Sequence, residues 1–368
     1  MVVYYSMIIW IVLLTFVYKT TKQTEDLDIE EEGFDLVPWP YAILSMGYIV
    51  FWAAIRSGVA DTKNYILIFE HAHVGINYAV EMVGSGAKDW GFTFLSIIWK
   101  TLVSDNYHYW LAAIAICSGI PIMKALRCKS PDFMWSMLLF ILMQHFTWLM
   151  NGIRQFLVAA ILFGCCRMIE ERKMTKFFIV VLLCSLIHKT ALIMIPLYFF
   201  FIVKPFSKLM WLFVLGILSL SFAVAPMLEA MGEVLQGSQY ESNLKQFAED
   251  DGVHPLRVIL MAIPGILAFI RREQIAELED SFLNICVNMS IIAWGFYFIG
   301  MLTSGIMIGR LPIYFELYNL ILLPYLVKAV YYDKSNLIYW GATIVYAAFF
   351  YILYGKSYYI SDLTGIVM

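Results

Sequence analysis

Long apolar runs separated by short polar turns make up most of the chain. A membrane helix needs about 20 apolar residues to cross roughly 30 Å of hydrocarbon. The runs near that length are 3–18, 38–55, 106–126, 132–150, 153–171, 209–227, 256–270, 282–303, 311–331 and 336–354, of which the first and 256–270 are short. The pattern predicts an all-α polytopic membrane protein with about 11–12 transmembrane segments. We expect residues 1–368 to form a single integral membrane domain.

The apolar segment 177–203 is too long for one crossing and too short for two full ones. Basic residues concentrate on the cytoplasmic side of membrane proteins, so their clusters help to choose a topology. The clusters are Lys19/Lys22, Arg127/Lys129, Arg167/Arg172/Lys173/Lys176, Lys204/Lys208, Arg271/Arg272 and Lys328/Lys334. Placing all of them inside requires 177–203 to enter the membrane and return, with a break near His188–Thr190. A single tilted helix is the alternative, and it would put Lys204 and Arg271 outside.

The broken-segment topology places the polar segments 56–105 and 228–254 outside and the acidic segment 25–35 inside. The polar residues at outer helix ends are then Arg56, Asp61, Arg154, His188 and Arg310. Because basic residues are depleted on the outer side, arginines gathered there indicate an anionic ligand. Half-helices at membrane depth commonly border a binding site, since unwound backbone needs a polar or protein-lined cavity.

The outer segments contain shorter periodic stretches. Residues 62–84 carry an approximate helical stripe, and 92–103 is apolar but too short to span, so we expect interfacial helices within 56–105. His71 and His73 would not face one another on a helix, which argues against a metal site. The acidic segment 228–254 is either a solvated loop or a lid over an outer cavity.

Composition and charge exclude several classes of protein. Of 368 residues, 61% are hydrophobic and 14% are charged, with a net charge of −3 and a mean hydropathy of +0.75. These values favour a membrane protein and argue against a nucleic-acid-binding surface. The six cysteines show no metal-type spacing, and the chain has no phosphate-binding glycine loop, DxD, HExxH or GxSxG motif. We therefore expect no metal and no cofactor, and a substrate that the membrane delivers.

Arg154 opens one apolar span, and His188 lies deep in the next one. An ionisable side chain at mid-membrane costs about 2.5–3.5 kcal/mol on insertion scales, so it usually serves a function. The structural alternatives are that Arg154 extends its charge to the interface and that His188 is a satisfied core residue.

Five motifs, in order, resemble those of the EpsG-type family of polysaccharide polymerases, relatives of the Wzy proteins that polymerise O-antigen and exopolysaccharide repeat units. They are RSGVADTKNYILIF (56–69), DWGF (89–92), NGIRQFLVAA (151–160), HKTALIMIPLYF (188–199) and GRLPIYFELYNLILLP (309–324). The first departs from the family at 59–62, where Val-Ala-Asp-Thr replaces Gly-Thr-Asp-Tyr. Together the motifs cover about residues 50–330.

The resemblance implies a GT-C-like glycosyltransferase at the outer face of the bacterial inner membrane, working in O-antigen, exopolysaccharide or capsule synthesis. The donor would be a glycan chain on undecaprenyl diphosphate, and the acceptor one lipid-linked repeat unit. Arginine offers permanently charged, bidentate donors for phosphate oxygens, so Arg154 and Arg310, then Arg56, are the candidates for a diphosphate clamp. Histidine is suited to act as a general base near neutrality, which favours His188, with Asp61 as the rival base.

Three further residues complete the predicted binding set. Gln155 follows Arg154 in its motif. Tyr65 and Tyr314 are aromatic residues near the outer face that could stack on sugars, although an interfacial aromatic belt is the other interpretation. Expected partners are the undecaprenyl-diphosphate-linked donor and acceptor, membrane lipid and a chain-length regulator protein, with no nucleic acid.

Other membrane activities stay open at this point. A lipid-linked glycan ligase would need the same side chains. A flippase or transporter would share the outer cavity and broken helix but should show an internal repeat, which the sequence lacks. A membrane acyltransferase modifying polysaccharide would also use a membrane histidine, usually with an acidic partner in the same span, and His188 has none there.

Overall fold

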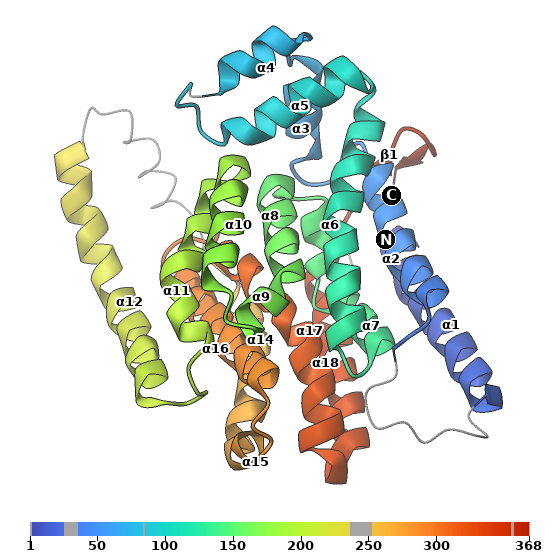
Figure 1. The fold of residues 1–368 in the computed structure, drawn as a ribbon, viewed down its shortest axis with the longest axis vertical. Coiled ribbons are helices and arrows are strands. Elements are labelled where there is room, and N and C mark those ends of the chain that lie inside the picture. Colours follow the sequence, from blue (N-terminus) through green and yellow to red (C-terminus); the bar gives the residue numbers. More distant parts are fainter. Residues whose placement is uncertain (1, 26–35, 84, 236–251, 355–356, 368) are drawn as a thin grey trace. The chain divides into compact units, whose positions relative to one another are not determined.

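A computed structural model describes residues 2–25, 36–83, 85–235, 252–354 and 357–367 (Figure 1). The described chain is helical apart from one small hairpin, in which β1 (Ile360–Ser361) pairs antiparallel with β2 (Ile366–Val367). Contacts divide the chain into two compact units, residues 1–195 with 333–368 and residues 196–332. The sequence predicts a single integral membrane domain, and this division is compatible with it. The single domain stays a prediction.

The first unit is built around α6, which packs closely on α2 and α8. Its elements are α1 (Val2–Glu25), α2 (Trp39–Ala54), α3 (Thr62–Glu70), α4 (Ile76–Met82), α5 (Trp90–Leu102), α6 (Tyr107–Lys129), α7 (Phe133–Leu142), η1 (His145–Leu149), α8 (Ile153–Gly164), α9 (Cys166–Glu170), α10 (Met174–Ile187), η2 (Lys189–Ile193) and α18 (Ser335–Tyr354), with η6 (Tyr332–Lys334) at its boundary. Helix α6 packs on both α2 and α8. Glycines permit this packing, because a Cβ on Gly119 or Gly164 would lie within 2.7 Å of Val50 or Pro121.

The second unit is organised around α16 (Ser281–Leu302), which is buried along much of its length. The other elements are α11 (Met194–Phe201), α12 (Lys208–Leu235), α14 (Pro255–Ile270), α15 (Arg272–Glu277), η3 (Leu311–Tyr314), η4 (Glu316–Tyr318), α17 (Asn319–Tyr325) and the π-helical turn η5 (Leu326–Val330). Asp280 caps α16 by accepting hydrogen bonds from the backbone N–H groups of Phe282 and Leu283, each at 2.8 Å. Helices α12, α14 and α17 pack around α16.

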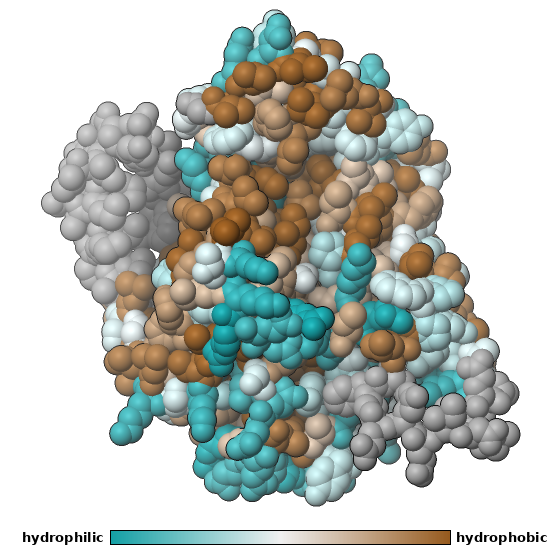
Figure 2. Space-filling model, in the orientation of Figure 1, coloured by the Kyte–Doolittle hydropathy of each residue, from teal (hydrophilic) through white to brown (hydrophobic). Residues whose placement is uncertain are grey.

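The prediction of an all-α polytopic membrane protein is confirmed. Among the described residues, four helices are long and apolar enough to cross a membrane, within Val2–Lys22, Tyr107–Lys129, Ser281–Leu302 and Tyr332–Tyr354, and shorter apolar helices of 10–17 residues accompany them. In the first unit, apolar side chains cover the visible surface of α6, α8 and α10, and hydrophilic ones gather around α9 (Figure 2). Large exposed apolar residues are what a lipid-facing surface requires. The number of crossings stays a prediction.

Several predicted spans are interrupted in the structure. The segment 311–331 is divided into η3, η4, α17 and η5, because Pro312 lies in the first turn of η3 and Pro324 lies inside α17. The polar Glu316 and Asn319 are buried between the two prolines. The run 132–150 ends its α-helix at Leu142, and 153–171 is divided at Cys165. The predicted break near His188–Thr190 is confirmed: α10 ends at Ile187 and a 3₁₀ turn follows.

The predicted outer segments are described only in part. The predicted stripe 62–84 contains two short helices, α3 and α4, and Gly75 adopts a φ of 135° between them; residue 84 lies outside the described residues. The short helix expected at 92–103 is α5. Of the acidic segment 228–254, residues up to 235 belong to α12, and 236–251 lie outside the described residues, as do 26–35 of the other acidic segment. The loop-or-lid interpretation therefore stays a prediction.

Candidate functional site

The side chains of Asp89 and His188 meet in the first unit. His188 Nδ1 lies 3.1 Å from Asp89 Oδ2, and the backbone N–H of Lys189 donates to Asp89 Oδ1 at 3.1 Å. The Asp89 carboxylate is inaccessible to solvent, whereas 16% of the His188 side chain is exposed. Burial opposes ionisation of Asp89, but the hydrogen bonds from His188 and Lys189 and the nearby charge of Arg154 outweigh it, so the pKa of this carboxyl lies below its ordinary value.

An ionised Asp89 fixes the tautomer of His188. A carboxylate only accepts hydrogen bonds, so Nδ1 of the imidazole must carry the hydrogen that it donates to Asp89. In the neutral ring, Nε2 is then the atom with the free lone pair. This is the arrangement that a histidine general base requires, with a carboxylate orienting the ring behind it.

Arg154 joins the same carboxylate from a third element. Its Nη1 lies 3.3 Å from Asp89 Oδ2, and 30% of its side chain is exposed. The guanidinium carbon lies 5.7 Å from the ring centres of both Tyr65 and Phe92, within the range of a cation–π contact. Its Nε is buried and has no hydrogen-bond partner among the described residues. The exposed part of the Arg154 side chain is the part that an anion can reach.

The local chain conformation explains how these side chains converge. Asp89 is the N-cap residue of α5 and has a φ of 56°, but its carboxylate makes no capping hydrogen bond and is directed to His188 instead. An aspartate at this position usually accepts a hydrogen bond from a backbone N–H of the first helical turn. Asp89 has a left-handed backbone conformation and makes no such bond, which indicates a functional constraint. Gly91 lets α5 reach α10, because a Cβ there would lie only 2.7 Å from the carbonyl oxygen of Leu186. The broken helix then presents His188 at the end of α10.

Asp61 and Arg56 hold the turns beside this cluster. Asp61 Oδ2 accepts a hydrogen bond from the backbone N–H of Gly152 at 2.9 Å, and Gly152 itself adopts a φ of 62° just before α8. Arg56 is completely buried; its Nε donates to Thr62 Oγ1 at 2.9 Å and its Nη1 donates to the Ala53 carbonyl. Burial lowers the pKa of Arg56 to about 10, with the charge of Asp61 opposing this effect, so the guanidinium stays protonated near neutrality.

The C-terminal hairpin supports the same turns from the other side. The backbone N–H of Ser57 donates to the carbonyl of Ile360 at 2.8 Å, and Ser361 Oγ donates to the carbonyl of Ile55 at 2.6 Å. Asp362 accepts a hydrogen bond from Tyr107 Oη at 2.5 Å and lies 3.2 Å from His108 Nε2. This second Asp–His contact was not anticipated from the sequence, because its members are more than 250 residues apart.

The other predicted residues are distributed over both units. Gln155 Nε2 lies 3.5 Å from Thr190 Oγ1, which connects α8 to η2, and Tyr65 is buried under Arg154. Arg310 is half-buried at the start of η3 in the second unit, and Tyr314 is buried in the same turn. The clamp formed jointly by Arg154 and Arg310 stays a prediction.

The sequence analysis missed two polar residues of the second unit. Glu316 is completely buried and accepts a hydrogen bond from Tyr297 Oη, and Asn319 is buried three positions later. The sequence does place the carboxyl group of Glu316 inside an apolar run, and this could have marked the residue, because buried ionisable groups in membrane proteins usually serve a function. It also missed that Asp89 is the partner of His188. The DWGF motif marked Asp89, but no local pattern reveals a contact across 99 positions.

The arrangement is suited to acid–base chemistry on an anionic substrate. Asp89, His188 and Arg154 present an oriented imidazole beside an arginine that is partly accessible. In the described part of the chain, no three His, Cys, Asp or Glu side chains are grouped so that they could hold a metal ion. The fixed positive charge in this cluster is that of Arg154.

Comparison with known proteins gave one match. Residues 39–362 match the model of the EpsG family, which is most of the chain. No curated protein and no solved structure shows significant similarity.

Proposed function

Because the chain belongs to the EpsG family, whose members are membrane proteins of the polysaccharide-polymerase type, we propose that it polymerises lipid-linked repeat units at the outer face of the bacterial inner membrane. The donor is a glycan chain on undecaprenyl diphosphate, and the acceptor is one repeat unit on the same lipid carrier. The enzyme is a glycosyltransferase with a GT-C-like architecture. A chain-length regulator protein is the expected partner.

The observation that carries this proposal is the shared contact of His188 and Arg154 with Asp89. In the reaction, an acceptor hydroxyl attacks the anomeric carbon of the donor sugar, and the bond from that carbon to the diphosphate oxygen breaks. His188 Nε2 takes the hydroxyl proton. Asp89 keeps the ring in the required tautomer and stabilises the imidazolium that forms.

Arg154 stabilises the departing diphosphate. A planar guanidinium can donate two parallel hydrogen bonds to phosphate oxygens, and its charge does not depend on pH. The position of Arg154 over Tyr65 and Phe92 leaves 30% of the side chain exposed. Arg310 is proposed as the second arm of the clamp, with Gln155, Tyr65 and Tyr314 as further ligand-binding residues.

The contacts favour His188 over Asp61 as the base. One oxygen of Asp61 is used by the backbone N–H of Gly152, so this carboxylate connects two turns of the protein. Arg56 is likewise committed to Thr62 and Ala53 at complete burial, which supports a role in holding the loop. His188 has a partly exposed ring and an orienting carboxylate.

An in vitro extension assay tests the proposal. Purified protein in liposomes receives a lipid-linked repeat unit, and the products are resolved by length. His188→Gln keeps hydrogen bonding without basicity, so extension should fall about 10²–10⁴-fold. His71→Gln, an exposed histidine at the end of α3, is the matched control. If His188→Gln extends chains at a near wild-type rate, His188 is not the base. If the protein moves the lipid across the bilayer but no preparation extends chains, the protein is not a polymerase.

The same Asp–His pair also fits transfer of an acyl group to a sugar hydroxyl. Such a reaction also requires a base to accept the proton of a hydroxyl, and the acidic partner absent from the span of His188 is supplied by Asp89. Mass spectrometry of the products separates the two reactions, since polymerisation adds whole repeat units whereas acyl transfer adds one acyl mass.

A further inference from the structure

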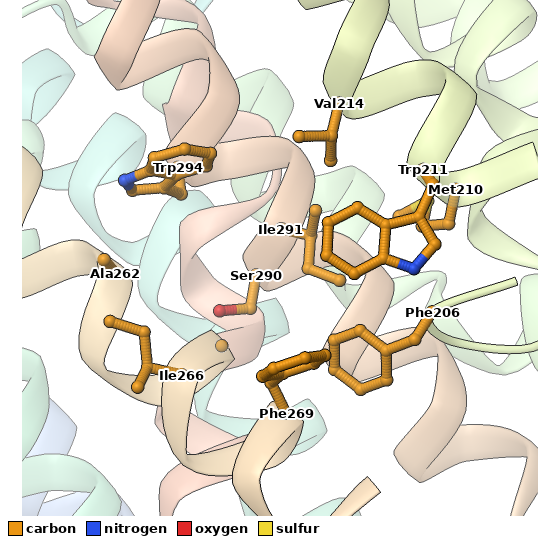
Figure 3. A pocket seen from close by; sticks show the side chains of 11 residues that line it. Phe206, Met210, Trp211, Val214, Ala262, Ile266, Phe269, Ser290, Ile291 and Trp294 are labelled. Carbon is orange, nitrogen blue, oxygen red and sulfur yellow. The ribbon is translucent and has the colours of Figure 1, made fainter. Parts of the chain in front are cut away.

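An apolar pocket in the second unit lies between α12, α14 and α16 (Figure 3). Its volume is about 270 Å³, just below the ~300–1,000 Å³ typical of ligand pockets. The aromatic side chains of Phe206, Trp211, Phe269 and Trp294 form much of its wall. Trp211 and Phe269 are exposed, so the pocket is open to the surface of this unit. In a membrane protein, such a surface faces lipid chains.

Basic residues accompany Phe206 and Phe269, two aromatic residues of the pocket wall. The turn between α11 and α12 contributes Phe206, which lies between Lys204 and Lys208 and contacts Phe269 with ring centres 5.3 Å apart. The guanidinium carbon of Arg272 lies 5.0 Å from the ring centre of Phe269, and its Nη2 lies 3.5 Å from Glu273 Oε1 in an exposed ion pair. Lys204 and Lys208 are exposed and form no ion pair with any residue that the structure describes. Their charge is available to an external anion.

The pocket wall also carries unsatisfied hydrogen-bonding capacity. Ser290 is buried, and its Oγ has no hydrogen-bond partner among the described residues. Figure 3 shows this hydroxyl among the apolar side chains, on the side of Ile266. A buried hydroxyl without a partner is costly, so a ligand with an acceptor atom would be favoured here.

We propose that this pocket binds an acyl chain of an anionic glycerophospholipid, whose phosphate contacts the basic turn Lys204–Lys208 and Arg272. The charge pattern of the sequence predicts that this end of the unit lies on the cytoplasmic side, where the leaflet carries anionic lipid. The ester carbonyls of a glycerolipid supply the acceptor that Ser290 lacks. An isoprenoid chain has no such acceptor, so the lipid carrier of the glycan is the less suitable occupant. Lipid binding at this site is independent of glycosyl transfer.

Native mass spectrometry of the purified full-length protein tests this site. The probes are dioleoyl-phosphatidylglycerol, zwitterionic dioleoyl-phosphatidylcholine and farnesyl phosphate as the isoprenoid. We expect phosphatidylglycerol to bind most tightly. Lys204→Gln with Lys208→Gln should lower its affinity about fivefold for each charge removed, the effect typical of a basic residue near an anionic membrane surface. Lys19→Gln with Lys176→Gln removes two exposed charges from the other unit and should have no effect.

A second variant examines the cavity itself. Gly265 lines the pocket beside Ser290, and a Cβ at Gly265 would lie 3.6 Å from Ser290 Oγ. Gly265→Leu should therefore occupy the cavity and abolish one bound lipid. Equal binding of the anionic and zwitterionic lipids, tighter binding of farnesyl phosphate, or unchanged affinity in the Lys204/Lys208 variant would each overturn the proposal. Because the lysines are exposed, their variant does not depend on the packing that Gly265→Leu alters.

Discussion

Asp89 and His188 are 99 positions apart in the chain, yet their side chains meet at 3.1 Å. The contact joins the start of α5 to the end of α10, and Arg154 of α8 adds the third member. Each of the three comes from a different helix end, where side chains can converge without a continuous helix between them. Perturbed and buried charges gathered in this way are typical of functional sites.

Asp89→Asn should abolish most activity while leaving the fold intact. The amide keeps the shape of the side chain but can no longer fix the His188 tautomer or stabilise its protonated form, so we expect a loss of about 10²–10⁴-fold in extension rate. Asp105→Asn is the control, because Asp105 is exposed. In a double variant with His188→Gln, the loss should be close to that of either single change, since the pair acts as a unit. Additive losses would show that the two residues act separately.

Arg154→Lys keeps the charge but loses the planar fork. We expect strongly reduced polymer formation at normal expression in the membrane, and Arg310→Lys should behave likewise. Arg167→Lys serves as a control, since Arg167 is an exposed residue paired with Glu171. The measurement is polymer yield together with the amount of protein in the membrane. If both lysine variants extend chains at the wild-type rate, the diphosphate clamp is wrong.

Gly91→Ala examines the packing that brings Asp89 to His188. The new Cβ would lie 2.7 Å from the carbonyl oxygen of Leu186, so α5 must move away from α10. Overpacking of this kind typically costs about 1–3 kcal/mol, and it should lower both the thermal stability in detergent and the extension rate. Gly47→Ala is the matched control, because nothing lies within 4 Å of its Cβ position, and it should be neutral or stabilising. Unchanged activity in Gly91→Ala would contradict the proposal that close packing of α5 on α10 brings Asp89 to His188.

Topology can be read by labelling single cysteines with an impermeant reagent in intact cells. In a background without the six native cysteines, Lys63→Cys should react, since α3 is predicted to lie outside. Lys173→Cys should react only after the membrane is permeabilised. Both positions are exposed in the structure, so a failure to react reports the side of the membrane and not burial inside the protein. Labelling of Lys173→Cys in intact cells would reverse the assignment.

The attachment of the C-terminal hairpin should weaken in acid. Burial raises the pKa of Asp362, but the hydrogen bond from Tyr107 and the contact with His108 outweigh this effect and leave the pKa below its ordinary value. A depressed carboxyl pKa contributes stability above about pH 4, and this contribution is lost as the pH falls through the folded value. The protection factors of residues 357–367 against hydrogen exchange, each taken relative to the intrinsic exchange rate at that pH, should therefore fall below pH 4. Asp362→Asn should show the lower protection already at neutral pH. Identical protection in both proteins at pH 7 would exclude this interaction as a support.

Much of the fold follows from local pattern, whereas the site depends on contacts that no pattern records. Apolar run length predicted the membrane class, and the basic clusters around 177–203 correctly predicted the break at His188. Hydropathy could not predict the interruption of 311–331, because Pro312 and the buried Glu316 alter the helix type without lowering the apolar content of the segment as a whole. The residue type of Arg56 suggested a ligand-binding arginine. In the structure its side chain is buried and hydrogen-bonded to Thr62 and Ala53, and the sequence alone does not reveal these contacts.

The contact of Gly91 with Leu186 restricts how the protein can move. Here the backbones of α5 and α10 approach without an intervening layer of side chains, so the two helices cannot slide past each other by exchanging rotamers. Helix α10 must therefore be carried along whenever α5 shifts. A substrate that needs more room beside the Asp89–His188 pair would therefore have to displace both helices together. The glycine turn at 75 is attached to the same pair of helices, because the backbone N–H of Gly75 donates a hydrogen bond to Thr101 Oγ1 of α5 at 2.9 Å.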